Sequence, residues 1–161
     1  MKHARTPKGF TIVELVTVLL ITSILSIYVG SKLFSTKSFQ AVYFYNDVLS
    51  SFRYAQKLAL TSGCHIQVSL TSTTLTLNKR ASCTTGTFTT AVRDPSSGAS
   101  TYVQTAPGTI TMSFSDTLLY FDSLGKCHRS SDASIASYTV TVNGKTMNIV
   151  GQTGFTYDPS T

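Results

Sequence analysis

The start of the chain combines a short basic stretch with a long apolar segment. Three basic side chains, Lys2, Arg5 and Lys8, precede the twenty predominantly apolar residues 10–29. At a rise of ~1.5 Å per residue, a helix of this length spans ~30 Å, the thickness of the hydrocarbon core of a bilayer. Basic residues before such a helix orient its N-terminus toward the cytoplasm. The sequence therefore predicts one membrane span at residues 10–30, with the rest of the chain on the outer side.

Two features distinguish this segment from an ordinary membrane anchor. Gly9 stands at the boundary between the basic stretch and the apolar segment, directly before Phe10. Glu14 lies inside the apolar segment, where an ionisable side chain costs roughly 2.5–3.5 kcal/mol on insertion scales and usually has a partner. A secretory signal would have a shorter apolar region closed by a small-x-small site, and none is evident. A plain membrane-anchored domain that never polymerises remains an alternative.

These residues resemble the prepilin peptidase site of type IV pilins and type II secretion pseudopilins. The resemblance is carried by Gly9-Phe10-Thr-Ile-Val-Glu14-Leu after a basic leader. It implies a leader at residues 1–9, cleavage by prepilin peptidase between Gly9 and Phe10, and N-methylation of Phe10. It also implies that Glu14 pairs with the N-terminal amine of a neighbouring subunit in a filament. In lipid, a carboxylate and an ammonium are each costly alone and tolerable together.

A helical pattern continues beyond the apolar segment. No proline occurs between Pro7 and Pro95, so a continuous helix is expected over residues 10–60. Its second half carries one apolar stripe at three- and four-residue spacing. The members of this stripe are Tyr45, Val48, Phe52, Ala55 and Ala59. The stripe predicts packing against the head rather than a ligand site, and Gly63 is the candidate left-handed helix stop.

The remaining sequence alternates apolar and polar residues in short segments, which is typical of β-strands. Seven strands are expected, at residues 65–70, 74–79, 101–105, 109–114, 118–121, 138–142 and 145–150. Asn143-Gly144 favours a tight hairpin turn between the last two. The predicted fold class is α+β, a long N-terminal helix packed on a C-terminal antiparallel β-sheet. The extracytoplasmic head is then residues 31–161, with an amphipathic helix at 31–61 and a β-rich part at 64–157.

The order of a long helix and about seven strands resembles the minor pilins grouped with the H pseudopilin of type II secretion. Arg53–Leu60, Phe121–Gly125 and Gly151–Tyr157 are similar to segments of the C-type minor pilin of mannose-sensitive haemagglutinin pili. Many major pilins have a helix-kinking proline where this chain has Gly30-Ser31, which favours a minor pilin. The resemblance implies incorporation into a type IV pilus-like filament and a role in initiating its assembly at the tip.

The same resemblance implies partners and a location. The expected partners are other pilin subunits through the N-terminal helix, prepilin peptidase and the inner-membrane assembly platform. Before assembly the chain is expected in the inner membrane, with a single pass and a periplasmic head. After assembly it is expected in a cell-surface or periplasmic filament. Whether that filament is a pilus or a secretion pseudopilus, and whether the subunit lies at the tip or along the shaft, stays open.

Three cysteines, Cys64, Cys83 and Cys127, follow the helix. An oxidising compartment permits a disulfide, and a hairpin of the first two strands would bring Cys64 and Cys83 together. Cys127 is then left buried, reactive or intermolecular. The pairs Cys64-His65 and Cys127-His128, with Cys83, offer zinc as an alternative. Neighbouring strand residues point to opposite faces, which disfavours one shared metal, and no cofactor is expected.

Charge and composition argue against catalysis and nucleic-acid binding. The chain has 13 basic and 7 acidic residues, but three of the basic residues belong to the leader. Glu14 is the single glutamate, one of the three histidines lies in the leader, and no phosphate-binding glycine loop occurs. The chain is therefore expected not to be an enzyme. Related minor pilins of DNA uptake carry Gly-Arg-x-Arg where this chain reads Gly151-Gln-Thr-Gly154, which disfavours nucleic acid. A filament-displayed binding module for DNA or a surface ligand is the alternative function.

Overall fold

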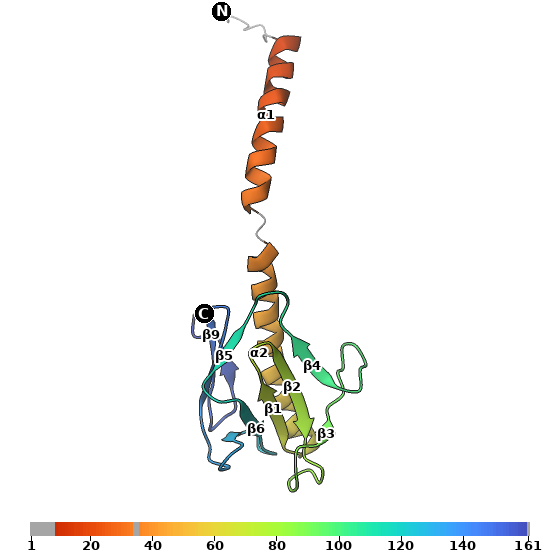
Figure 1. Cartoon of the computed structure of the whole chain (residues 1–161), viewed down its shortest axis with the longest axis vertical. Coiled ribbons are helices and arrows are strands. Elements are labelled where there is room, and N and C mark those ends of the chain that lie inside the picture. The colour runs from red at the N-terminus through yellow and green to blue at the C-terminus, as the bar shows by residue number, and fades with distance from the viewer. Residues whose placement is uncertain (1–8, 34–35, 161) are drawn as a thin grey trace, which may run out of the picture. The chain divides into compact units, whose positions relative to one another are not determined.

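A computed structural model describes residues 9–33 and 36–160 of the chain. The chain divides into two units, an N-terminal unit up to Ser38 and a head that begins at Phe39 (Figure 1). Residues 1–8 of the predicted leader, which was expected to end at Gly9, lie outside the described residues. So does the join at residues 34 and 35, through which the helix was expected to be continuous.

The N-terminal unit contains helix α1, Ile12–Leu33. Thr11 precedes it and caps it, because its Oγ1 accepts the N–H of Glu14 at 3.2 Å. The described hydroxyl groups along α1 bond to carbonyl oxygens one turn earlier and so add no unpaired polar group. These hydroxyls belong to Thr17, Thr22, Ser23 and Ser26. No helix in the part of the chain that the structure describes is both long and apolar enough to cross a membrane. The membrane span at residues 10–30 stays a prediction.

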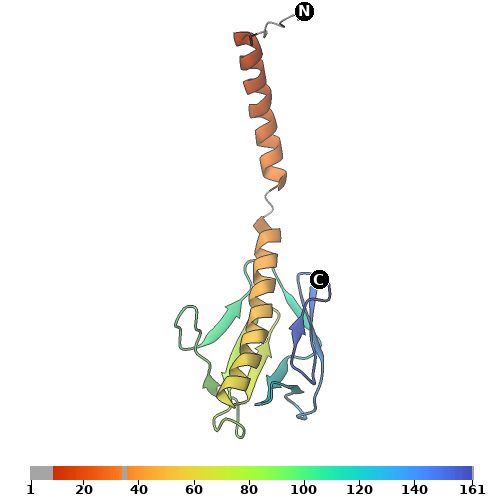
Figure 2. The same ribbon diagram turned by 180° about the vertical axis from the view of Figure 1, so that it is seen from behind.

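Helix α2, Thr36–Ser62, supplies one wall of the head. All five residues of the predicted stripe are at most 1% exposed, which confirms the stripe as core. The helix ends where Gly63 adopts a left-handed φ of +66°, so the predicted stop is also confirmed. Figure 2 shows α2 running across the strands of the head.

The strands form two antiparallel sheets rather than the single sheet that was expected. The first has the order β3-β2-β1-β6-β7, with β4 also paired to β2, and the second has the order β10-β9-β8-β5. The first contains β1 Ile66–Leu70, β2 Thr74–Lys79, β3 Thr90–Ala91, β4 Tyr102–Thr105, β6 Leu118–Phe121 and β7 Cys127–Arg129. The second contains β5 Met112–Phe114, β8 Tyr138–Val142, β9 Lys145–Ile149 and β10 Thr156–Tyr157. Seven of these strands correspond to predicted ones, whereas β3, β7 and β10 were not predicted.

The core joins the stripe of α2 to the inward-facing residues of both sheets. In β1, Ile66, Val68 and Leu70 are buried and alternate with half-buried polar residues. This alternation is what a strand with one core face requires. Asn143 and Gly144 both have positive φ, at 48° and 86°, as the predicted tight turn of the β8–β9 hairpin demands.

Candidate functional site

The processing and assembly residues lie at the start of the N-terminal unit. Gly9 and Phe10 precede α1, and Phe10 is 80% exposed. Glu14 lies in the first turn of α1 and is exposed. Within the part of the chain that the structure describes, no group pairs with its carboxylate. The geometry therefore leaves the bond Gly9–Phe10 and the Glu14 side chain accessible to a partner.

Glu14 also occupies a helix-capping position that the sequence analysis missed. Thr11 is the N-cap of α1 and Glu14 is the third helical residue, the spacing of a capping box. A carboxylate in the first turn also interacts favourably with the positive end of the helix dipole. The pattern Thr-x-x-Glu was visible in the sequence. An acid at this position is therefore favourable for the start of α1, independently of the pairing with another subunit that the resemblance implies.

The described surface of α1 is apolar and uncovered. Its large apolar side chains up to Leu25 are between 47% and 82% exposed. They are Ile12, Val13, Leu15, Val16, Val18, Leu19, Leu20, Ile21, Ile24 and Leu25. An exposed apolar surface of this extent requires lipid or protein to cover it.

The structure confirms the predicted disulfide between Cys64 and Cys83. The β1–β2 hairpin brings the two cysteines together, because backbone bonds extend past the strands. His65 N–H donates to the Cys83 carbonyl at 2.8 Å, and Arg80 N–H donates to the His65 carbonyl at 3.1 Å. The zinc alternative is wrong, since two of its three thiolates are bonded to each other. Among the described residues, no cluster of three metal-ligating side chains is present.

Loss of this disulfide is expected to destabilise the head. The bridge closes a loop of 19 residues, and the loop-entropy relation gives about 3 kcal/mol for such a loop. For a head of this size, that corresponds to a fall in Tm of roughly 10 °C. Thermal unfolding of the double variant Cys64→Ser/Cys83→Ser, followed by circular dichroism, measures the shift. A reductant should lower the Tm of the native chain to that of the variant and leave the variant unchanged. An unchanged native Tm under full reduction would contradict the prediction.

Cys127 was expected to be buried, reactive or intermolecular, and the structure shows that it is buried. Its side chain is 0% exposed in β7, and burial raises the pKa of its thiol to about 12. A protonated thiol without access to solvent neither attacks a substrate nor bridges to another chain. Cys127 is therefore a core residue of the head.

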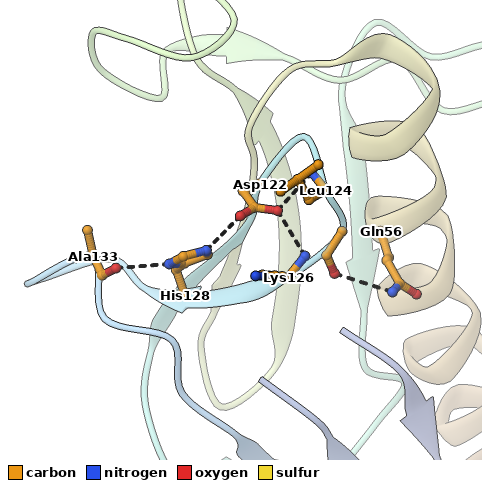
Figure 3. Close-up of polar contacts among 7 residues, drawn as sticks. Gln56, Asp122, Leu124, Lys126, His128 and Ala133 are labelled. Atoms are coloured by element: carbon orange, nitrogen blue, oxygen red, sulfur yellow. Dashed lines mark hydrogen bonds and ion pairs between the residues drawn. The ribbon is translucent and has the colours of Figure 1, made fainter. Parts of the chain in front are cut away.

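A polar cluster lies at the turn between β6 and β7 (Figure 3). His128 Nε2 contacts Asp122 Oδ2 at 2.8 Å, and His128 Nδ1 contacts the Ala133 carbonyl at 2.9 Å. The other Asp122 oxygen accepts the N–H groups of Leu124 and Lys126, both at 2.9 Å. Burial raises the pKa of Asp122, but the bonds from His128, Lys126 and Leu124 outweigh it and hold that pKa below its ordinary value.

This cluster holds the turn and is not arranged for catalysis. A general base needs one ring nitrogen free to take a proton from a nucleophile. Both ring nitrogens of His128 already face acceptors, the Asp122 carboxylate and the Ala133 carbonyl. The ring also stacks on Tyr120 at 5.0 Å. The histidine therefore orders the β6–β7 turn and the loop that follows β7.

Gln56 on α2 joins two turns that the sequence analysis treated separately. Its Nε2 donates to the Gly125 carbonyl at 3.3 Å and to the Thr153 carbonyl at 2.6 Å. Gly154 has a φ of +64°, and a Cβ at that position would lie 1.9 Å from the Gly125 carbonyl oxygen. The segment Gly151–Gly154, compared above with a DNA-binding motif, is therefore a closely packed turn against α2.

Three arginine side chains of the head are engaged by contacts within the head. Arg129 pairs with Asp116 at 3.3 Å and with Asp132 at 3.6 Å. Arg80 lies over the ring of Phe88 at 4.6 Å. Arg53, near the C-terminal tail, donates to the Thr156 carbonyl. Because these three guanidinium groups already contact groups of the head, they are poorly placed to form a phosphate-binding surface.

Comparison with known proteins defines the class of fold. No family model matches the chain, and no curated protein matches it either. Among solved structures, the chain is similar to a type IV minor pilin in two crystal forms. The first form has a TM-score of 0.53 and 14% identity over 72% of this chain. The second has a TM-score of 0.54 and 12% identity over 76% of this chain. In both cases 90% of the other chain is covered. The similarity establishes a pilin fold of the α+β class, as predicted.

The particular protein in both crystal forms is FimU of Pseudomonas aeruginosa. At this level of identity the likeness is one of fold.

Proposed function

We propose that this chain is a minor pilin, cut between Gly9 and Phe10 and built into a type IV pilus-like filament. One observation supports the proposal above all. A head with the fold of a type IV minor pilin follows an apolar helix that begins next to the candidate cleavage bond and carries Glu14 in its first turn. A membrane anchor alone needs neither the glycine at the boundary nor the acid within the apolar segment.

In the proposed filament, Glu14 pairs with the N-terminal amine of Phe10 on a neighbouring subunit. The carboxylate has no partner among the described residues of its own chain, and cleavage after Gly9 would create a new amine on Phe10, four residues before it. The exposed apolar face of α1 would be covered first by the inner membrane and then by the helices of other subunits. Prepilin peptidase and the assembly platform act on the chain during this transfer.

The finer role that we propose is initiation of assembly at the filament tip. Its support is the similarity to minor rather than major pilins, together with the absence of a proline at Gly30-Ser31. The head is then periplasmic before assembly and exposed on a cell-surface or periplasmic filament afterwards. The subgroup of H-pseudopilin-like and mannose-sensitive haemagglutinin minor pilins is part of this proposal.

The proposal predicts a change in mass that depends on the peptidase. Intact mass spectrometry of the chain from cells with prepilin peptidase should show loss of residues 1–9 and gain of one methyl group. Cells without the peptidase should yield the uncut chain. The variant Gly9→Val should also remain uncut, although a Cβ at Gly9 has nothing within 4 Å and leaves the fold unaffected. An uncut native chain in competent cells, or cleavage elsewhere, would refute the proposed processing.

A further inference from the structure

A hollow in the head lies between α2 and the edge of the first sheet. Its volume is about 240 Å³, below the 300–1,000 Å³ of pockets for drug-sized ligands. Tyr54 and Leu58 of α2 form one side, Ala91 of β3 and Val92 form the other, and these surfaces are mainly apolar. The hollow therefore suits a small ligand or a single side chain.

One side of the hollow is held in place by aromatic stacking and hydrogen bonds. Tyr54 stacks on Tyr102 with ring centroids 5.4 Å apart, and the Tyr102 hydroxyl bonds to Ser51 at 2.9 Å within the core. The Tyr54 hydroxyl donates to the Arg93 carbonyl at 3.5 Å. The Tyr54 ring thus presents a stable apolar surface.

The loop on the opposite side is also ordered by its own contacts. The Asp94 carboxylate accepts bonds from Ser96 N–H, Ser96 Oγ and Ser97 Oγ at 2.7–2.8 Å. Arg93 Nε donates to the Gly98 carbonyl at 3.2 Å, which fixes the guanidinium at the base of this loop. Asp94 is therefore committed to its own loop, while the remaining Arg93 nitrogens are available to a ligand.

The charged side chains that line the hollow are cationic, and the nearby Asp94 carboxylate is occupied by the serines of its own loop. Lys79 and Arg93 both line it, and no acidic side chain does. Within the described residues, neither cation forms an ion pair. Two cations beside an apolar surface complement a ligand that has an anionic group on an apolar body.

We infer that this hollow binds a small carboxylate with an apolar body, either a free organic acid or the C-terminal residue of a peptide. The apolar part packs on Tyr54, Leu58 and Val92, and the carboxylate lies between Lys79 and Arg93. This inference does not rest on the proposed role in a filament, because it concerns the head alone. For so small and open a hollow, we expect a Kd on the order of 1 mM.

The test is a titration of the full chain in detergent micelles, followed by NMR with the free probe concentration measured by dialysis. The probe is 3-phenylpropionate and its neutral control is 3-phenylpropionamide. Binding of the acid should shift the signals of Tyr54, Leu58 and Val92, and the amide should bind at least tenfold more weakly. Acetyl-glycyl-phenylalanine, which has a peptide carboxylate, distinguishes the two ligand sources. Tighter binding of this peptide than of 3-phenylpropionate would identify a peptide C-terminus as the ligand, and the reverse order would identify a free organic acid.

Variants distinguish recognition of the carboxylate by Lys79 and Arg93 from attraction of the anion by the overall positive charge of the chain. Lys79→Gln and Arg93→Gln should each weaken binding of the acid about tenfold and leave that of the amide unchanged. Lys57→Gln, which removes the same charge from an exposed position outside the hollow, should leave both unchanged. Ala91→Leu should fill the hollow and abolish binding of both probes. Equal binding of acid and amide, full affinity in both glutamine variants, or shifts confined to other residues would overturn the inference.

Discussion

Glu14→Gln is expected to reduce incorporation into filaments by more than tenfold without changing the stability of the head. Glutamine serves as well as glutamate at the third position of a capping box, so the start of α1 is preserved. The substitution removes the negative charge alone. It leaves the N-terminal amine of the neighbouring subunit without a counter-charge in an apolar setting, and a loss of 1.4 kcal/mol already reduces an equilibrium tenfold. Quantitative immunoblotting of sheared filaments against whole cells measures the effect.

Two further variants show which role of Glu14 matters. Glu14→Asp keeps the charge and should retain most of the incorporation. Thr11→Ala removes the capping oxygen that accepts the Glu14 N–H and should cost about 1 kcal/mol of helix stability, with little effect on incorporation. If Glu14→Gln is incorporated as efficiently as the native chain, the negative charge of Glu14 is not needed and the proposed pairing is wrong.

Gly154→Ala is expected to destabilise the head by about 3–5 kcal/mol. The left-handed φ of +64° costs an alanine roughly 1 kcal/mol. The new Cβ would also lie 1.9 Å from the Gly125 carbonyl oxygen and 2.7 Å from Gln56 Nε2, so the turn must move away from α2. That movement breaks the bonds of Gln56 to both turns, at about 1 kcal/mol each. Chemical denaturation followed by circular dichroism gives the change in free energy of unfolding.

Gly144→Ala is the matched control for this experiment. Gly144 also has a left-handed φ, +86°, but a Cβ there meets nothing within 4 Å. Its substitution should therefore cost only the backbone strain of about 1 kcal/mol. Similar losses in the two variants would show that the contact between Gly154 and Gly125 contributes nothing to stability.

The elements that the sequence predicted well are those with a regular local pattern. The stripe of α2 repeats every three or four residues, and β8 and β9 alternate around Asn143-Gly144. The pairing of Cys64 with Cys83 followed from the same reasoning, since it required only that two neighbouring strands form a hairpin. In each case the interacting residues are close in sequence, and the pattern repeats often enough along the segment to be recognised.

The elements that were missed are short or depend on distant partners. The strands β3 and β10 contain two residues each, too few for an alternating pattern. β7 contains three residues and pairs with β6 across the turn that Asp122 and His128 hold. The division into two sheets was missed for the same reason, because a local pattern does not state which strands become neighbours.

In the candidate site, too, contacts between residues close in sequence could be predicted and contacts between distant residues could not. Gly9, Phe10 and Glu14 are contiguous, so their motif could be recognised in the sequence, and the processing it implies stays a prediction. By contrast, the hydrogen bonds from Gln56 to the Gly125 and Thr153 carbonyls join residues that are 69 and 97 positions apart, so no local pattern indicates them.

The sequence by itself determined the apolar helix, the amphipathic stripe and the hairpins, and it contains the candidate cleavage motif, because hydrophobic period and turn chemistry are local properties. Only the tertiary structure decided that Cys127 is buried, that His128 has no free nitrogen, and that Lys79 and Arg93 line one hollow. Each of these depends on which side chains approach one another after the two sheets have packed on α2. That choice is made by the shape of the whole core and not by any one segment.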